Sequence, residues 1–405
     1  MNKHALAPVI SGMSLALALS AASAQGLDPG KLDLSWYGVA DVTAVAASSG
    51  FGRKVRFEGG GGMQASRLGL RANRVFGDGV TALATLEAGV QFDTGSTGSA
   101  APVLGINDTN ASSGGAPGNG ARIFARQIFA GVRGSLGQAT IGRQYTGSYF
   151  GGAVIGSAWG DGFYANPVNI TPLVGGMPTR VDNSLVYLSP NLAGFSGMLT
   201  LAAGSENNVD NPTVSGTAAT TVSDKSGQGW DLLVRYSGGP FSAGLSSWAV
   251  NNASWNATAG ETGLAKKKGV QLVASYDFDR VLLAGAYVNG KISGGNYENV
   301  TRTLSKADAW SLSARIPFGA DKRQVVFLAY TSLNDKSPLN RDAKLWGGAY
   351  WYQLETNLRL YVHYGQVDNN ANAQYALADA GNLTGNVTTP GVKPKGVGIG
   401  INYAF

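Results

Sequence analysis

Apolar and polar residues alternate with a period of two along much of this chain, which is typical of extended strands with two different faces. Residues 396–405 show the pattern most clearly, because glycine, asparagine and alanine occupy the face opposite the apolar side chains. The apolar face consists of Val397, Ile399, Ile401, Tyr403 and Phe405. A membrane-barrel strand that turns one face to lipid explains such a stripe. The core strand of a soluble sheet would also explain this one segment.

Two more alternating segments, residues 67–73 and 81–91, flank a tight link at residues 76–79 that is rich in turn residues. Two period-two segments joined by a short turn predict a β-hairpin. The same hairpin pattern recurs through the rest of the chain.

Short and long connections alternate between the predicted strands. Short links are predicted near residues 134–137, 190–194, 237–240, 277–280, 318–322 and 353–357. Long connections are predicted over about 93–121, 146–180, 205–227, 251–268, 290–307, 333–342 and 366–395. Long loops on one side and short turns on the other are typical of outer-membrane barrels. We therefore predict an all-β fold, a transmembrane antiparallel β-barrel of about sixteen strands.

Aromatic residues gather in or near the ends of the predicted strands, and amphipathic rings favour the two membrane–water interfaces. Interfacial positions are predicted for Tyr276, Phe278, Tyr330, Trp346, Tyr350, Trp351, Tyr352, Tyr361, Tyr364 and Tyr403. The alternative is that these rings fill the core of a soluble sandwich.

The first 24 residues have the three parts of a secretory signal peptide. Lys3 lies in a charged stub, an apolar run follows over residues 6–19, and small residues end the segment at Ala24. We expect cleavage before Gln25, which leaves residues 25–405 as the barrel domain. An exported chain without a lysine-rich arm is not expected to bind nucleic acid.

Composition adds three limits to this picture. The chain has no cysteine, so disulfides and thiolate metal sites are excluded, and we expect no cofactor. Its 59 glycines argue against long helices, and 44% hydrophobic residues at a mean hydropathy near zero require fine alternation in a membrane protein. The formal net charge of +6 suggests attraction to small anions or acidic surfaces.

Several short motifs occur together in this chain. They are Trp36-Tyr37-Gly38-Val39-Ala40-Asp41, Ser66-Arg67-Leu68-Gly69-Leu70-Arg71, residues 83–89 (LATLEAG), Phe124-Ala125-Arg126-Gln127, Ile141-Gly142-Arg143-Gln144-Tyr145, residues 183–187 (NSLVY) and the terminal Tyr403-Ala404-Phe405. With these motifs the chain resembles the trimeric porins of Gram-negative bacteria, especially those of the beta-proteobacterial type. The likeness is strongest over residues 33–195 and in the last strand.

The resemblance implies a sixteen-strand barrel that forms a homotrimer among outer-membrane lipid and lipopolysaccharide. It also implies that the third long loop, within residues 146–180, folds inward and narrows the lumen. Many enteric relatives place an acidic cluster in this loop, whereas Asp161 is its single acid here. A constriction that strongly attracts cations is therefore not expected.

Arginines are the candidate functional residues. Arg67 and Arg71 alternate with Leu68 and Leu70, so both should point into the lumen. Arginine stays charged at any relevant pH, and a few fixed charges in a narrow lumen act at reduced dielectric. With positions implied by the resemblance, the candidate constriction residues are Arg67, Arg71, Arg126, Arg143, Arg180, Glu87 and Asp161.

Two questions about these residues stay open. For Arg126 the alternation is ambiguous, because either the Ile128 face or the Phe129 face could be the outer one. Each arginine could also form an ordinary ion pair in the lumen wall or anchor a loop. The run Lys266-Lys267-Lys268 is expected to be a solvated or lipopolysaccharide-facing patch rather than a selectivity element.

The leading hypothesis is a passive diffusion channel for small hydrophilic solutes and ions, with a preference for anions. A non-conducting or adhesive surface barrel is the alternative, and a soluble periplasmic sandwich is disfavoured by apolar stripes that lack a partner.

A hydrolase in the barrel wall would need a catalytic base. His363 is the one histidine after residue 24, and no HExxH, GxSxG or phosphate-loop motif accompanies it. We therefore expect that the protein is not an enzyme.

Overall fold

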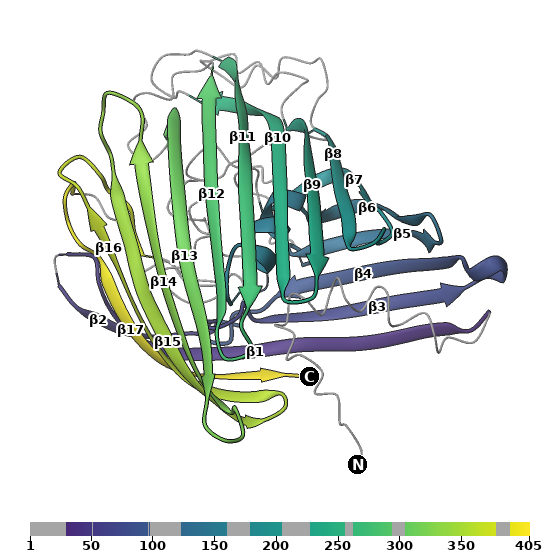
Figure 1. Cartoon of the computed structure of the whole chain (residues 1–405), viewed down its shortest axis with the longest axis horizontal. Helices are drawn as coiled ribbons and strands as arrows, with labels where there is room; N and C mark the ends of the chain where they lie inside the picture. The colour runs from purple at the N-terminus through teal and green to yellow at the C-terminus, as the bar shows by residue number, and fades with distance from the viewer. Residues whose placement is uncertain are drawn as a thin grey trace.

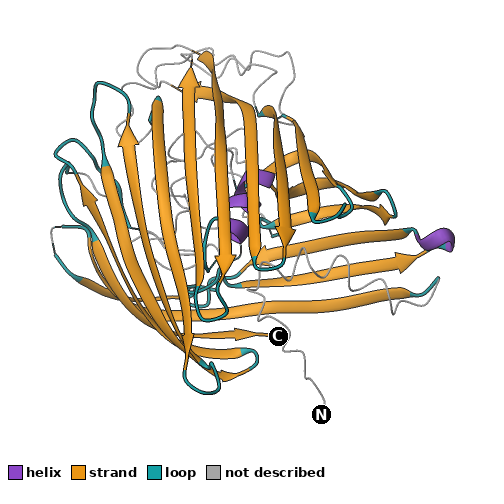
Figure 2. Ribbon diagram, viewed as in Figure 1, coloured by secondary structure: helices purple, strands orange, loops and turns teal. Residues whose placement is uncertain are grey.

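The computed structural model describes residues 30–50, 52–95, 97, 123–159, 179–204, 227–255, 262–293, 304–377 and 389–405. Strands make up most of this part of the chain (Figure 2). Within these ranges, no helix has the length and apolar character needed to cross a membrane. The expected signal peptide, residues 1–24, lies outside the described residues.

The described strands form one sheet in which every neighbouring pair is antiparallel (Figure 1). Their bounds are β1 Leu32–Ser48, β2 Lys54–Glu58, β3 Arg67–Val75, β4 Thr81–Gly89, β5 Gln127–Gly134, β6 Gly137–Tyr145, β7 Arg180–Leu188, β8 Phe195–Ala203, β9 Gln228–Gly238, β10 Phe241–Trp255, β11 Thr262–Asp277, β12 Leu282–Ser293, β13 Lys306–Phe318, β14 Gln324–Asp335, β15 Ala343–Glu355, β16 Leu358–Asn369 and β17 Lys395–Ala404. A short helical turn, η2 (Gly77–Gly79), joins β3 to β4. The helical segments α2 (Gly147–Phe150) and η5 (Gly151–Ile155) follow β6.

The sheet closes into a ring at β1, because both edges of this strand are paired. One edge pairs with β17, from Val39 opposite Ala404 to Ser48 opposite Lys395. The other edge pairs with β3 and then with β2, which follow one another along it. β2 and β3 are thus one barrel strand interrupted at residues 59–66, so the 17 segments make a closed barrel of sixteen strands. The predicted fold class and strand number are confirmed.

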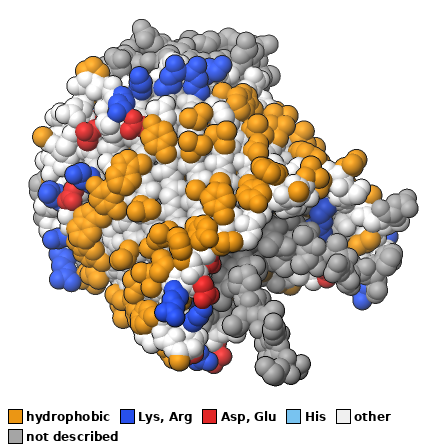
Figure 3. Space-filling model, in the orientation of Figure 1, with side chains coloured by type: hydrophobic (Ala, Val, Ile, Leu, Met, Phe, Trp, Pro, Cys, Tyr) orange, Lys and Arg blue, Asp and Glu red, His pale blue; other side chains and the backbone are white. Residues whose placement is uncertain are grey.

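Alternation gives the barrel an apolar outer face and a buried inner face. On β17 the outward Ile399 is 66% exposed, whereas Asn402 on the opposite face is fully buried. Hydrophobic side chains cover a broad band of the outside (Figure 3). The stripe predicted from the last ten residues therefore faces outward, as expected for a strand that meets lipid.

The glycines of β17 make room for two large side chains on the inner face of β16. A Cβ atom at Gly398 would overlap Nε2 of His363, and one at Gly400 would overlap the Tyr361 hydroxyl. Both rings lie against the glycine backbone, and His363 is only 1% exposed. The inward positions of β17 that face these two rings are therefore glycines, because a larger side chain there would overlap the rings.

The structure corrects two of the predicted interfacial aromatic positions. Tyr361 points inward, where its hydroxyl donates a hydrogen bond to Asp41. Trp351 is also on the inner face, 3% exposed, with its ring centroid 4.5 Å from that of Trp159. The sequence shows which aromatic residues lie near strand ends, but the face that each ring occupies depends on whether its position in the alternation points inward or outward.

The predicted long connection over residues 251–268 is wrong. β10 continues to Trp255 and β11 begins at Thr262, so most of that stretch is paired strand. Lys267 consequently points inward and is buried, while Lys266 and Lys268 are exposed on the outer face. Polar strand ends that extend beyond the lipid resemble loops in sequence, which explains the error.

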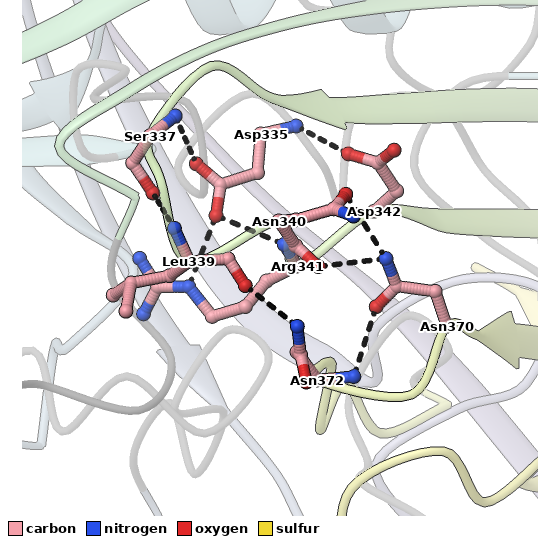
Figure 4. A network of polar contacts seen from close by, with 8 residues as sticks. All are labelled: Asp335, Ser337, Leu339, Asn340, Arg341, Asp342, Asn370 and Asn372. Carbon is pink, nitrogen blue, oxygen red and sulfur yellow. Dashed lines mark hydrogen bonds and ion pairs between the residues drawn. The ribbon is translucent and has the colours of Figure 1, made fainter.

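A polar network ties two connections together at the end of the barrel where the long connections lie (Figure 4). Asp335 accepts hydrogen bonds from the backbone N–H and the Nε–H of Arg341, at 3.0 and 3.1 Å. Asn370 donates from Nδ2 to the carbonyl oxygen of Asn340 at 2.7 Å. The loop between β14 and β15 is thereby fixed to the segment that follows β16.

Candidate functional site

Glu87 is the centre of a basic cluster on the inner wall of β3 to β7. Its Oε1 accepts a hydrogen bond from Nε of Arg126 at 2.8 Å, and its Oε2 lies 3.8 Å from Nε of Arg67. The side chains of all three residues are nearly buried. Arg67 and Glu87 meet because each occupies an inward position on one of two paired strands, β3 and β4.

Tyr145 joins a further arginine to this cluster. Its hydroxyl oxygen accepts hydrogen bonds from Nη2 of Arg126 at 2.6 Å and from Nη2 of Arg180 at 2.5 Å. The guanidinium carbon of Arg180 also lies 4.2 Å from the centroid of the tyrosine ring, within the range of a cation–π interaction. Tyr145 thus holds two like charges side by side, at the end of β6.

Arg71 joins the cluster through Tyr37 of β1. The Arg71 guanidinium carbon lies 3.8 Å from the centroid of the Tyr37 ring. The Tyr37 hydroxyl donates a hydrogen bond to Oε2 of Glu87 at 2.9 Å. Arg71 therefore stacks on the ring whose hydroxyl is bonded to the same carboxylate.

Arg143 has different partners. Its Nη1 forms an ion pair with Oδ1 of Asp182 at 2.7 Å, and its Nε donates to the carbonyl oxygen of Ala125 at 2.6 Å. The register between β6 and β7 shifts from Gly142 to Gln144, so the regular alternation is broken at this arginine. Arg143 braces the backbone next to Arg126, and its charge is balanced locally by an acid.

Two other predicted site residues need separate comment. Asp161 lies outside the described residues. Arg126 immediately precedes β5, whose outer face carries the exposed residues Ile128 and Val132. Regular alternation would therefore turn Arg126 outward, but its position before the strand lets its side chain reach Glu87.

The first part of the third long connection packs against the inner wall of the barrel. The Ser148 N–H of α2 donates to both carboxylate oxygens of Asp231 on β9, at 2.9 and 3.1 Å. The segment η5 lies against β10, β11 and β12 (Figure 2). The Ala158 N–H then donates to Oγ of Ser313 on β13 at 2.9 Å. Residues 147–159 thus run along the interior from β9 to β13.

A second segment, residues 59–66, also lies inside the barrel. Asp41 on β1 accepts hydrogen bonds from the backbone N–H groups of Gly62 and Gln64, both at 2.9 Å. The two inward segments meet where Nε1 of Trp159 donates to the carbonyl oxygen of Met63 at 3.1 Å. The interior is therefore narrowed by backbone from two places in the chain, each anchored on a buried aspartate.

Sequence reasoning missed several of these residues. Tyr145 ends a motif that carries the family resemblance, but a tyrosine that bridges two arginines has no sequence signature. Asp41 and Asp231 are single acids on inward strand positions, which alternation could have located but could not have assigned to an anchor. The four consecutive glycines at residues 59–62 were the available signal for the second inward segment, because they interrupt the period of two.

The arrangement can attract and orient small anions. Within this cluster, Arg67, Arg71, Arg126 and Arg180 accompany one carboxylate, Glu87, so positive charge is in excess by three. Guanidinium groups offer planar forks to carboxylate and phosphate oxygens. In the described part of the chain, no group of three or more His, Cys, Asp or Glu residues could hold a metal ion.

Comparison with known proteins gives consistent matches. Residues 12–372 match the family described as Gram-negative porin. The chain is similar to an outer membrane porin protein of Bordetella pertussis, with 28% identity over 372 residues, 84% of this chain and 82% of that protein.

Solved structures match almost the whole length of the chain. The anion-selective porin from Comamonas acidovorans aligns with a TM-score of 0.67 and 21% identity over 93% of this chain and 100% of that one. The trimer form of in-vitro folded OmpT from Vibrio cholerae aligns with a TM-score of 0.64 and 15% identity, over 93% and 100% of the two chains. These likenesses support the barrel fold.

Proposed function

This chain belongs to the Gram-negative porin family, whose members are outer-membrane channels and not enzymes, and we propose that its pore prefers anions. The chain forms a channel for passive diffusion of small hydrophilic solutes and ions. Residues 1–24 would be removed during export, and 25–405 would form the barrel. His363, considered above as a catalytic base, is a packed side chain of the inner wall.

One observation carries the anion preference. The excess positive charge of the Glu87 cluster lies on the inner wall, next to the base of the inward segment that starts at α2. Tyr145 contacts the arginines and also stacks on Tyr149 of α2, with ring centroids 5.0 Å apart. This contact supports the proposal that the charges lie where the lumen is narrowed. The similarity to a solved porin that is described as anion-selective supports the same proposal.

The magnitude of the effect follows from Coulomb's law. A fixed unit charge about 7 Å from a passing ion changes its energy by about 0.3–0.6 kcal/mol in water, depending on salt screening. Since an anion gains what a cation loses, each charge changes the anion-to-cation permeability ratio about three- to sevenfold. Three excess charges are enough to set the sign of the selectivity without a specific binding site.

Homotrimer formation and contact with lipid are also proposed. The trimer form of the similar OmpT structure supports a trimer. The outward faces of β1, β3, β5 and β6 carry exposed apolar side chains, among them Trp36, which is 69% exposed, and Ile141, which is 67% exposed. A second copy of the chain would cover this face, and outer-membrane lipid and lipopolysaccharide would surround the remainder.

Planar-bilayer recording tests the proposed function directly. The trimer is reconstituted and the reversal potential is measured across a KCl gradient. Stable conductance with a reversal potential of the same sign as the chloride equilibrium potential supports an anion-preferring pore. A cation sign would refute the preference, and a correctly folded barrel without conductance would favour an adhesive surface protein.

A further inference from the structure

Lysines form a row on the outer face of the barrel, at the ends of β11, β12 and β13 near the long connections. Lys268 of β11 lies directly opposite Lys291 of β12, and Lys291 lies directly opposite Lys306 of β13. All three are exposed, as is Lys266, two positions beyond Lys268 on the same face. In Figure 3 basic side chains gather in a row at this end of the barrel, above hydrophobic side chains.

Three like charges in register should repel one another. Directly opposite residues on antiparallel strands have Cβ atoms about 4.5–5.5 Å apart, and like charges at such positions are destabilising. Among the described residues, none of these lysines has a carboxylate within 4.0 Å, although the next outward position of β13, Asp308, is paired with Lys336 at 3.0 Å. The row therefore keeps a local excess of positive charge that an external anion could neutralise.

The level of the row on the barrel indicates which anion it meets. Four residues below Lys291 on the same face of β12 is Tyr287, which lies opposite Trp310 of β13. The Trp310 ring centroid is 5.3 Å from that of Tyr330, so aromatic rings form a belt beneath the lysines. Such belts lie at the membrane interface, and four strand residues span about 13 Å. The lysines are thus at the height of lipid headgroups.

Strand β15, two strands beyond β13 in the sheet, supplies a contrast. Lys344 of β15 is also exposed near the long connections, but it lies opposite Asp368 of β16. Asp368 is in turn 3.5 Å from Nζ of Lys393. The basic residues near β15 and β16 are thus accompanied by an acid, whereas the row on β11 to β13 has no acid in register.

We propose that Lys268, Lys291 and Lys306, with Lys266 beside them, bind the phosphate groups of phosphorylated glycolipids in the outer leaflet. The acyl chains of the same lipid would cover the apolar outward side chains below, such as Val270 and Leu272 of β11. The lysines would take the place of divalent cations that otherwise link lipid phosphates. This inference depends on the outer-membrane location of the barrel and is independent of its ion selectivity.

Native mass spectrometry of the purified full-length protein in detergent tests the inference, with bis-phosphorylated lipid A as the probe and EDTA present. The wild type should bind lipid A and should bind its dephosphorylated form at least tenfold more weakly. A lysine near an anionic lipid surface is worth about a factor of five, so Lys291→Gln should weaken binding about fivefold. The triple variant Lys268→Gln/Lys291→Gln/Lys306→Gln should lose far more, and Lys344→Gln should bind as the wild type.

Two further measurements keep the result interpretable. If the triple variant fails to form a heat-resistant barrel, lipid A binding by Lys291→Gln alone tests the proposal. The reversal potential of each variant should stay at the wild-type value, which separates this inference from the proposed anion preference. Unchanged lipid A binding by Lys291→Gln, or equal binding of the phosphorylated and dephosphorylated forms by the wild type, would overturn the proposal.

Discussion

Nε of Arg126 lies 2.8 Å from Oε1 of Glu87, and this ion pair is buried in the barrel wall. Removing one partner of a buried pair leaves an uncompensated charge, so the two residues are structurally dependent on each other. Because one carboxylate, Glu87, contacts several arginines, it positions their side chains but neutralises only part of their charge. The cluster therefore stabilises the barrel wall and also leaves a net positive charge facing the lumen.

Replacing Glu87 with glutamine should increase the preference for anions. The Glu87→Gln amide oxygen can still accept a hydrogen bond from Arg126, while the negative charge is lost. We expect the anion-to-cation permeability ratio, measured from reversal potentials, to rise about three- to sevenfold. Asp182→Asn, which removes an acid outside the cluster, should have a smaller effect, and a shift of Glu87→Gln toward cations would contradict the account.

Tyr145→Phe should make the side chains of Arg126 and Arg180 more mobile without changing their charge. The variant loses the oxygen that accepts hydrogen bonds from Arg126 and Arg180, but the ring stacking on Tyr149 can remain. We expect a reversal potential of unchanged sign and larger open-channel current noise. Tyr187→Phe is the matched control, because that hydroxyl bonds to the Leu136 carbonyl in a turn at the far end of the wall. Equal noise in both variants would count against the role given to Tyr145.

Asp231→Ala should release the start of the inward segment. The Ser148 N–H would remain buried without its acceptor, which costs about 1–3 kcal/mol. We expect more frequent closures and a broader distribution of single-channel conductance. Asp231→Asn retains one acceptor oxygen and should lie between the wild type and the alanine variant. A conductance histogram for Asp231→Ala that matched the wild type would rule out this anchoring role.

Arg341→Ala should free the connection between β14 and β15 at the outer mouth. Arg341 Nε donates to Asp335 at the end of β14, which fixes the shape of this connection, and the carbonyl oxygen of the preceding Asn340 accepts a hydrogen bond from Asn370 in the neighbouring segment. Limited proteolysis of the intact, folded protein should therefore cut within residues 336–342 faster than in the wild type. The reversal potential should not change, because the site is separate from the Glu87 cluster. Unchanged proteolysis would show that the network is not needed to hold the connection.

The sequence was sufficient for the fold because one physical rule repeats along the chain. Alternation placed Ile399 and Leu68 outside and Arg67 and Glu87 inside, and each strand repeats the same test. Alternation fails where a strand is interrupted or not yet begun. The side chain of Arg126 turns inward just before β5, and Arg143 lies at a register shift, so neither partner could be derived from parity.

The remainder of the site depends on contacts between distant segments. Tyr145 with Arg126, Asp231 with Ser148, and Trp159 with Met63 are separated by 19, 83 and 96 residues. No local pattern specifies such pairs. Long strand ends were mistaken for loops at residues 251–268 for a related reason, since polar residues beyond the lipid carry no apolar stripe.

The most direct test of the central claim compares two neutralisations of lumen arginines in bilayers under a KCl gradient. Arg67→Gln/Arg126→Gln removes two charges from the Glu87 cluster, while Arg143→Gln/Asp182→Asn removes an arginine together with its own acid. We predict that the first lowers the anion-to-cation permeability ratio by about tenfold or more and that the second leaves it near the wild-type value. An unchanged ratio in the cluster variant, or an equal change in both, would contradict the claim that these arginines set the selectivity.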